Sequence, residues 1–412
     1  MKILALTNLY PNPIQPHRAA FNRHQFRMLG QRHALRVIAP TLWLDEWQLW
    51  RRKGLRMPAE RRIVNEGIVV DHPRYWYTPK LMRGLYGRFF LESVRATFER
   101  AVEEFSPDIV FAPWAYPDGW AAVRLAHRHG LPAVIQVHGS DVRMVDQFGA
   151  RLDGTRAAIR EADGVIAVSA ELAQRVAAFG AAPEKIRVIV DGVDRQVFHP
   201  GPRAQARAEL GLSADTRHLL FIGNLLPVKG VDVLLQACAL LDRRMPDWQL
   251  HLIGEGSLRQ ALERSAQTLG IAAKVRFHGS MPQQALPTWL RAADLFVLPS
   301  RSEGIPNVLL EASACATPYV ASAVGGIPEI ARLGASVLVP PEQPEPLAAA
   351  IADSLASPPR QPENGPRDRE DAVADVSAFL SATLARTRVR PGCPSNPSLD
   401  VTSSVSPTAD RP

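Results

Sequence analysis

The feature that most constrains the fold is a regular alternation of short apolar segments with helical segments. Helices are expected at Phe21 to Arg32, Ser93 to Phe105 and Pro117 to Gly130. Strands are expected between helices in the first half at Lys2 to Thr7, Leu35 to Ala39, Asp108 to Ala112, Ala133 to Val137, Gly164 to Val168 and Ile186 to Ile189. Short apolar strands between helices are typical of a mostly parallel sheet covered on both faces. The pattern predicts an α/β, doubly wound architecture.

The second half repeats this pattern. Its expected strands are His218 to Ile222, Gln249 to Ile253, Val275 to Phe277, Leu295 to Leu298, Tyr319 to Ala321 and Val337 to Val339. The 412 residues, 46% of them hydrophobic, suffice for two cores. A turn-rich linker at 191–203 places the domain boundary, so we expect domains at 1–195 and 196–358. Beyond a proline-rich spacer, 370–385 predicts an amphipathic helix, and 386–412 has the composition of a disordered tail.

Cysteine content and the N-terminus favour a cytoplasmic protein. The cysteines at 238, 315 and 393 are widely separated, which favours a reducing compartment and argues against zinc. The first eleven residues have too short an apolar run for a signal peptide and are expected to form the first strand. We find no run of 18 apolar residues that would cross a membrane.

The net charge of +7 is concentrated near the N-terminus, where residues 1–110 contain 18 Lys and Arg against 10 Asp and Glu. Tryptophan, leucine and methionine residues are mixed with arginine and lysine within 42–62, and a second aromatic and basic patch covers 80–91. Such segments suit the headgroup layer of an anionic membrane, so we expect peripheral association with its inner face. Alternatively, the aromatic side chains pack under the domain's own loops. A nucleic-acid partner is not expected, because no recognised motif accompanies the charge.

The stretch from Ser300 to Ser322 carries the strongest functional signal. The apolar strand before it ends in a polar turn that contains Glu303, and an apolar-periodic helix follows that contains Glu311. Pro306 suits the first helical turn, and free N–H groups at such a turn bind phosphate. Two carboxylates beside a phosphate site suit the hydroxyl groups of a sugar nucleotide. Ordinary helix-dipole pairing of the two glutamates is the alternative.

Four further sites follow predicted strands, where ligands bind in open parallel sheets. In FIGNLLPVKG, Gly223 permits close approach of a ligand and Lys229 precedes a helix, a position that a bound phosphate would explain. In VHGSD, His138 is either a ligand-binding or an ordinary core histidine. The glycines at 254 and 256 are needed for turn geometry in any case. The pair at 325 and 326 either faces the cleft or simply connects two elements.

Taken in order, HGSD, GNLLPVKG, IGEGSLRQAL, FHGSMP, PSRSEGIPNVLLEASACATPYVAS and AVGGIPEI resemble the retaining nucleotide-sugar glycosyltransferases of family four. These enzymes have the GT-B fold, in which two Rossmann-like domains face each other across a cleft. The opening LTNLYPNPIQPHRAAFNRHQ is similar to the subgroup that builds exopolysaccharide or teichuronic acid. The resemblance covers about residues 2–356 in organisation and is most specific in the second domain.

The resemblance implies a role for each matching residue. Glu303 would hold the hydroxyl groups of the donor sugar, Glu311 the ribose, Lys229 the diphosphate, and His138 would lie over the donor sugar. The expected donor-binding set is completed by Gly223, Asn224, Gly254, Met281, Gly304, Ile305, Asn307 and Val308. The last helix would cross back to pack on the first domain.

Three positions depart from the family pattern. Asn224 replaces the usual arginine of the diphosphate loop, so phosphate charge would rest more on Lys229. The segment 18–21, RAAF, replaces the glycine-rich loop after the first strand. The spacer before the last helix is short and rich in proline.

The sequence therefore predicts a retaining hexosyltransferase that uses a UDP- or GDP-sugar and a glycan, or a lipid-linked glycan, as acceptor. No D-x-D triplet occurs, so we expect neither a metal nor a cofactor. A sugar-nucleotide epimerase, a phosphorylase-like enzyme and a non-catalytic nucleotide-sugar-binding protein remain alternatives.

Overall fold

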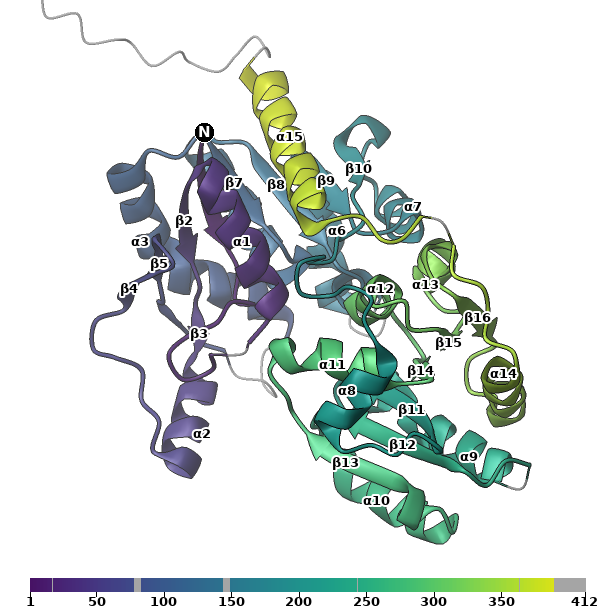
Figure 1. The fold of residues 1–412 in the computed structure, drawn as a ribbon. Helices are drawn as coiled ribbons and strands as arrows, with labels where there is room; N and C mark the ends of the chain where they lie inside the picture. The colour runs from purple at the N-terminus through teal and green to yellow at the C-terminus, as the bar shows by residue number, and fades with distance from the viewer. Residues whose placement is uncertain (17, 78–82, 144–148, 243, 363, 389–412) are drawn as a thin grey trace, which may run out of the picture.

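Two parallel-stranded sheets, one from each half of the chain, form the centre of the molecule (Figure 1). The computed structural model describes residues 1–388 except 17, 78–82, 144–148, 243 and 363. Helices cover the sheets on both faces, so the predicted doubly wound GT-B architecture is confirmed. All strands of the first sheet precede residue 189 and all strands of the second follow residue 216. The boundary expected near residue 195 stays a prediction.

The first sheet has eight strands in the order β10-β9-β8-β7-β1-β2-β5-β4. Its strands are β1 (Lys2–Leu6), β2 (Ala34–Ile38), β4 (Arg62–Asn65), β5 (Ile68–Asp71), β7 (Ile109–Ala112), β8 (Ala133–Val137), β9 (Gly164–Ala167) and β10 (Ile186–Val188). All neighbours pair in parallel except β4, which is antiparallel to β5 at the edge. A separate short ladder joins β3 (Thr41–Leu42) to β6 (Arg74–Tyr75).

The helices of this domain are α1 (Ala20–Arg32), α2 (Trp43–Lys53), α3 (Tyr86–Phe105), α4 (Trp120–Arg128), α5 (Ser140–Arg143), α6 (Gly149–Glu161) and α7 (Ala170–Ala178). Two sequence predictions differ from these bounds. The helix expected from Ser93 begins at Tyr86, and the one expected from Pro117 begins at Trp120 after a wide turn at 115–119. The aromatic and basic segment at 42–62, for which no helix was predicted, contains α2. The β4–β5 hairpin was not predicted. Its edge strand is short and half-exposed, so its apolar pattern is weak.

The second sheet is fully parallel in the order β13-β12-β11-β14-β15-β16. Its strands are β11 (Arg217–Ile222), β12 (Trp248–Ile253), β13 (Val275–Gly279), β14 (Leu295–Leu298), β15 (Tyr319–Ser322) and β16 (Ser336–Val339). The helices that follow the linker are α8 (Arg203–Leu210), α9 (Val231–Asp242), α10 (Arg259–Thr268), α11 (Leu286–Ala292), α12 (Asn307–Ala314), α13 (Ile327–Ile330), α14 (Pro344–Ala356) and α15 (Arg369–Arg388). The predicted bounds of these strands agree with the observed bounds to within one residue. The exception is β13, which was predicted to end at Phe277 and extends to Gly279.

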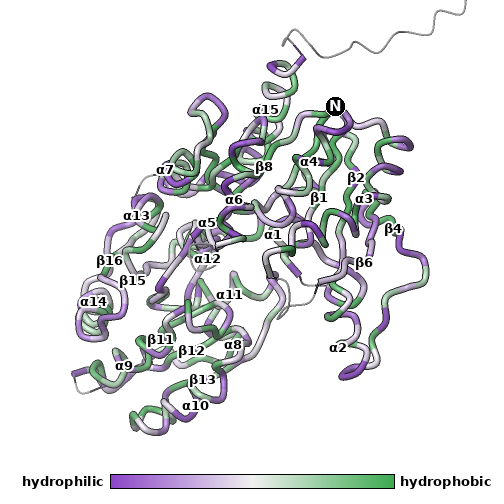
Figure 2. Tube along the Cα trace, turned by 180° about the vertical axis from the view of Figure 1, so that it is seen from behind, coloured by the Kyte–Doolittle hydropathy of each residue, from purple (hydrophilic) through white to green (hydrophobic). Residues whose placement is uncertain are grey.

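Hydrophobic residues concentrate in the strands and on the inner helix faces of both domains (Figure 2). β14 shows the reason, because all four of its residues are buried between helices. A strand covered on both faces has no polar face, and this explains the continuous apolar run at 295–298.

The last helix, α15, leaves the second domain and packs beside α1 and β9 of the first (Figure 1). Val373, Val376 and Leu380 are buried in the same apolar cluster as Ile3 and Phe26. Ser377 also contacts His33 through a hydrogen bond of 2.6 Å. The helix continues to Arg388, so the predicted start of a disordered tail at residue 386 is wrong by three residues. The rest of that tail lies outside the described residues.

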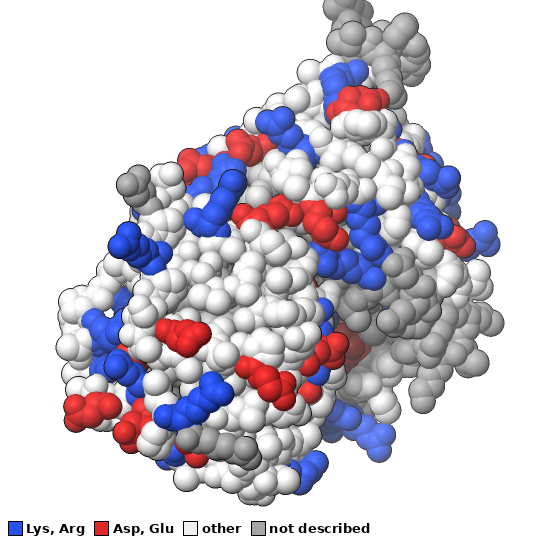
Figure 3. All heavy atoms as spheres, turned by 90° about the vertical axis from the view of Figure 1, so that its right-hand side faces the viewer, with Lys and Arg blue, Asp and Glu red and all other residues white. Residues whose placement is uncertain are grey.

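Charge is distributed evenly on the side of the molecule drawn in Figure 3. Lys and Arg are interspersed there with Asp and Glu, and neither sign forms a continuous field. Among the described residues, no helix is both long and apolar enough to cross a membrane.

We predict that Leu380→Ala destabilises the protein by about 2–5 kcal/mol, because it empties a fully buried leucine position on α15. Chemical denaturation measures this change. Ala382→Ser, at an exposed position of the same helix, is the control and should change stability by less than about 0.5 kcal/mol. Equal stability of the two variants would contradict the docking of α15.

Candidate active site

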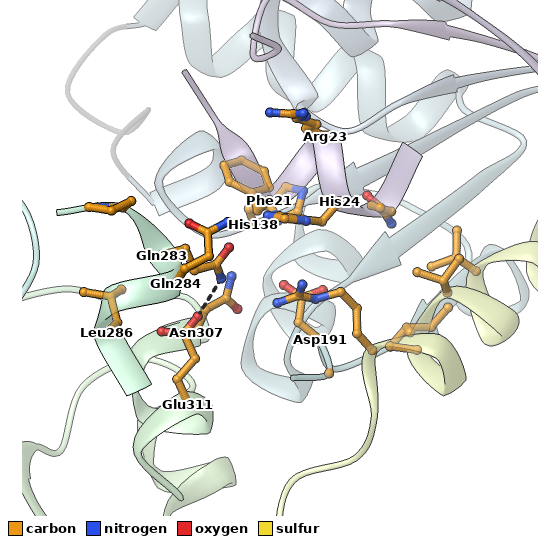
Figure 4. Close-up of a pocket in the computed structure, with 18 of the residues that line it drawn as sticks. Phe21, Arg23, His24, His138, Asp191, Gln283, Gln284, Leu286, Asn307 and Glu311 are labelled. Atoms are coloured by element: carbon orange, nitrogen blue, oxygen red, sulfur yellow. Dashed lines mark hydrogen bonds between the residues drawn. The ribbon is translucent and has the colours of Figure 1, made fainter. Parts of the chain in front are cut away.

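A cavity of about 770 Å³ lies between the two domains, where the carboxyl ends of both sheets face each other (Figure 4). α1 and the end of β8 provide one wall, and the loop after β13 together with α12 provides the other. The start of α15 and the interdomain linker close the far end. In Figure 4, Phe21, His24 and His138 of the first domain face Gln283 and Asn307 of the second. This position agrees with the rule that ligands bind beyond the carboxyl ends of parallel strands.

Lys229 and Glu303 form an ion pair of 2.6 Å between Nζ and Oε1. They follow β11 and β14, which are adjacent in the sheet. Ser300 Oγ donates a second hydrogen bond of 2.6 Å to the same carboxylate oxygen. Oε2 of Glu303 has no hydrogen bond within the described chain, so it is available to a ligand hydroxyl group. The sequence predicted both residues as site residues but not their direct contact.

Glu311 lies one helical turn after Asn307 and lines the cavity. Its side chain is 7% exposed and accepts a hydrogen bond of 3.2 Å from Gln283 Nε2. Burial raises the pKa of Glu311 to about 6, and the hydrogen bond from Gln283 opposes this shift. A carboxylate that is buried against its preference for water is more consistent with ligand binding than with a solvent-exposed helix residue.

The first turn of α12 has unused polar groups. The backbone N–H groups of Asn307 and Val308 make no hydrogen bond to any described residue, and Asn307 Oδ1 is buried without a partner. Pro306 precedes this turn as the cap residue. The free donors at a helix N-terminus can bind an anion, as the sequence suggested.

His138 lies at the end of β8 on the opposite side of the cavity. Its ring contacts the Phe21 ring at 5.0 Å between centroids and stacks on Trp114 at 6.4 Å. Burial lowers the pKa of His138 to about 4, so the ring is neutral at pH 7. Its Nε2 atom is buried and has no partner among the described residues. An imidazole in this state can form one hydrogen bond to a ligand without a change in charge.

Asp141 positions the histidine. Its carboxylate accepts backbone hydrogen bonds from His138 at 3.1 Å, Gly139 at 2.8 Å and Ala115 at 3.2 Å. Burial raises the pKa of Asp141 to about 6, although the hydrogen bonds lower it. The carboxylate therefore holds the loop after β8 in place.

The two domains are in direct backbone contact where His138 meets Gly304. A Cβ atom on Gly304 would lie 2.0 Å from the carbonyl oxygen of His138, so no side chain fits there. This contact places Glu303 next to His138 even though the two residues are 165 positions apart in the sequence.

The predicted donor-binding residues are divided between two places. Met281, Asn307, Glu311 and His138 line the cavity. Gly223 and Gly254 instead pack against each other, because a Cβ on Gly254 would lie 2.0 Å from the carbonyl oxygen of Gly223. The turn-geometry explanation accounts for Gly254. The remaining residues of the predicted set lie outside the cavity lining. Asn224 is exposed, Ile305 is buried, and the half-buried residues are Lys229, Glu303, Gly304 and Val308.

Several cavity residues were not predicted. Asp191 lies in the linker directly after β10, so the strand-end rule could have identified it. Burial raises the pKa of Asp191 to about 6, and the positive charge of Arg369 opposes this shift. His24 and Arg369 reach the cavity only through the packing of α1 and α15. No local sequence signal marks these two.

Among the described residues, no group of three or more His, Cys, Asp or Glu side chains could hold a metal ion. The expectation that the protein needs no metal stays a prediction.

Family models match both halves of the chain. "Glycosyltransferase Family 4" matches residues 27–197, and "Glycosyl transferases group 1" matches residues 202–370. The D-inositol 3-phosphate glycosyltransferase of Thermobispora bispora is 36% identical over 339 residues, which cover 76% of this chain and 78% of that protein. The chain belongs to the family 4, group 1 glycosyltransferases. The resemblance seen in the sequence is thereby confirmed.

Other relatives of this glycosyltransferase have different names. TuaC of Bacillus subtilis, ascribed to teichuronic acid biosynthesis, is 27% identical over 362 residues, covering 85% of this chain and 88% of that protein. Sucrose-phosphate synthase of Thermosynechococcus elongatus has a TM-score of 0.70 at 20% identity and covers 94% of this chain and 97% of its own. Anabaena HepE in complex with UDP and glucose has a TM-score of 0.68 at 19% identity, and the match covers 92% of this chain and 99% of the HepE chain. The two structures support the fold. The family shows that the chain is an enzyme that transfers sugar from a nucleotide sugar to an acceptor.

We predict that Glu311→Gln stabilises the free protein by about 2 kcal/mol above pH 7 and has little effect below pH 4. The folded-state pKa of about 6 lies above the ordinary value of 4.5, so the native state prefers the protonated carboxyl. This contribution to stability is present at low pH and is lost as the pH rises through 6. Denaturation of both proteins at several pH values measures the difference.

Glu345→Gln, at an exposed first-turn position of α14, is the control and should show no pH-dependent gain. If Glu311→Gln is less stable than the wild type above pH 7, the ionised Glu311 carboxylate is not unfavourable in the folded protein, and the account of its pKa is wrong.

Proposed function

We propose that this glycosyltransferase is a retaining hexosyltransferase that extends a glycan or lipid-linked acceptor in cell-surface polysaccharide synthesis. The observation that carries the proposal is the backbone contact between Gly304 and His138, which brings the Lys229–Glu303 ion pair of the second domain next to His138 in the cavity wall. The similarity to TuaC over most of both chains supports the polysaccharide acceptor.

We propose that the donor diphosphate replaces Glu303 as the partner of Lys229 in their ion pair. Its negative charge attracts the Lys229 ammonium group and the free N–H groups of α12, and Glu303 then accepts hydrogen bonds from the sugar hydroxyl groups. These donors are fixed before the reaction, so they stabilise the charge that grows on the leaving diphosphate. Glu311 is placed to bind the ribose.

The cleft supports retention without a covalent enzyme intermediate. The Glu303 carboxylate is held by Lys229 and Ser300, and His138 is neutral, so neither is an evident nucleophile. In the proposed step the acceptor oxygen attacks on the same face from which the diphosphate leaves. The leaving phosphate oxygen takes the acceptor proton, and the bond from the anomeric carbon to the diphosphate breaks as the new glycosidic bond forms.

A second acceptor class deserves a direct test. Seven relatives of 35–39% identity are D-inositol 3-phosphate glycosyltransferases. The cavity contains Arg23, His24 and Arg369, whose side chains could face an anionic acceptor. Parallel assays with D-inositol 3-phosphate and with lipid-linked glycans distinguish the two acceptors. Donor turnover without a glycosylated product would instead favour an epimerase, and donor binding without turnover would favour a non-catalytic protein.

Membrane association is proposed through α2. Trp47 and Trp50 are 42% and 45% exposed. Arg51 lies 5.4 Å from the Trp47 ring and Arg56 lies 5.1 Å from the Trp50 ring. Paired cationic and indole groups suit an anionic headgroup layer. Trp43 instead packs on Trp76, as expected if aromatic side chains of this segment pack within the domain itself. The second predicted patch, at 80–91, falls partly outside the described residues.

Lys229→Ala should lower turnover by about 100-fold, because it removes one preorganised donor from the diphosphate. Lys274→Ala is the matched control, since Lys274 lies in the same domain but pairs with Asp242 instead of Glu303. Steady-state transfer with UDP- and GDP-sugars measures the effect, and thermal melting checks the fold. Turnover within a factor of a few of the wild type would remove Lys229 from the mechanism.

Glu303→Ala should abolish transfer and leave the protein folded.

The double variant Trp47→Ala, Trp50→Ala should bind anionic vesicles at least about tenfold more weakly than the wild type, because it removes the apolar contact with the headgroup layer. Co-sedimentation with phosphatidylcholine vesicles containing phosphatidylglycerol measures binding. Val64→Ser, at an exposed apolar position on β4, is the control. Equal binding of the double variant and the wild type would count against α2 as the membrane surface.

A further inference from the structure

Glu329 of α13, in the second domain, forms hydrogen bonds to the N-terminus of α7 in the first. Its Oε2 atom accepts from the backbone N–H of Ala170 at 2.7 Å, and its Oε1 atom accepts from that of Glu171 at 2.9 Å. Both carboxylate oxygens are therefore used across the cleft. The glycine pair at 325 and 326, which the sequence left unexplained, lies directly before α13.

The carboxylate completes the first turn of α7. A helix leaves its first four N–H groups without internal partners. In α7 the third is bonded to the hydroxyl of Ser169 at 3.1 Å, and the fourth to the backbone oxygen of the same residue at 3.0 Å. The first two depend on Glu329, so separation of the domains would leave them to water. A negative charge at this end also interacts favourably with the helix dipole.

α7 in turn holds the loop that carries His138. Glu171 forms an ion pair with Arg143, in the helix that follows this loop. The Nε atom of Arg175 donates a hydrogen bond of 2.7 Å to the backbone oxygen of Val142. α7 is thus connected to the segment that ends β8 and positions the histidine.

On the other domain, the glycine pair holds the loop that carries Glu303. The N–H of Gly326 donates a hydrogen bond of 3.0 Å to the carbonyl oxygen of Gly304. A Cβ atom on Gly325 would lie 1.9 Å from the carbonyl oxygen of Glu303, so these backbones are in direct contact. Glu329 follows this turn by a few residues.

We propose that Glu329 is an interdomain clasp that keeps His138 in position over the donor sugar held by Glu303. It is a positioning residue, because it touches no atom of the cavity and acts through α7 and the glycine turn. The inference rests on the proposed function for its effect on turnover. The two hydrogen bonds between Glu329 and α7 can be tested without measuring activity.

The test compares Glu329→Ala and Glu329→Gln with the wild type. Loss of the carboxylate should raise hydrogen exchange at the amides of Ala170 and Glu171 at least about tenfold, because both lose their acceptor. Turnover should fall about tenfold. The affinity for UDP or GDP should stay within about twofold, since Lys229 and Glu311 lie in the second domain alone. Glu329→Gln keeps one acceptor oxygen, so its effects should be smaller but in the same direction.

Glu345→Ala, which changes a glutamate in the first helical turn of α14, is the matched control and should leave all three quantities unchanged. Wild-type exchange and turnover in folded Glu329→Ala would overturn the proposal. So would a loss of nucleotide affinity as large as the loss of turnover, since that would place Glu329 at the donor site. If the alanine variant does not fold, the glutamine variant decides. A wild type that is inactive with every donor contradicts the proposed function, while the exchange measurement still decides the clasp.

Discussion

The contact between the backbone of His138 and Gly304 is the constraint on which the arrangement of the cleft depends. These two backbone segments approach so closely that a single methyl group on Gly304 would collide with the His138 carbonyl oxygen. Around this point the ends of β8 and β14 meet, and with them a neutral imidazole and a carboxylate that come from different domains. α15 returns to the first domain and buries Leu380 there, in the same apolar cluster as Ile3 of β1.

The electrostatics of the cleft combine paired and unpaired groups. Lys229 and Glu303 compensate each other, so the unliganded protein avoids a buried isolated charge. Glu311 forms no ion pair within the described part of the chain, and its raised pKa indicates an unfavourable environment for the ionised form. The His138 imidazole nitrogen and the Asn307 amide oxygen are also buried without partners. Unsatisfied polar groups from both domains around one cavity are expected where a polar ligand completes the hydrogen bonding. Stability is then lower than the same scaffold could reach, as is common at functional sites.

Much of the architecture followed from the sequence because its strands are buried on both faces. β14 is a continuous apolar run and β8 is apolar except for Gln136, and runs of this kind are recognisable without tertiary information. The edge strand β4 was missed for the opposite reason, since half-exposed residues carry little pattern. Lys229, Glu303 and His138 could be proposed as site residues because each follows a strand, and Glu311 because it lies in the helix that follows β14. Arg369 and His24 could not, because only the packing of α15 and α1 brings them to the cavity. The role of Glu329 likewise depends on a partner about 160 residues away.

The most direct test of the account is the anomeric configuration of the new glycosidic bond in the product, determined by proton NMR. Transfer from an α-linked UDP- or GDP-hexose to a lipid-linked glycan or to D-inositol 3-phosphate is followed with the wild-type enzyme. An α-linked product is predicted, because the acceptor attacks on the face that the diphosphate leaves while Lys229 and α12 hold the leaving group. A β-linked product would require attack from the opposite face of the sugar and would contradict the proposed mechanism.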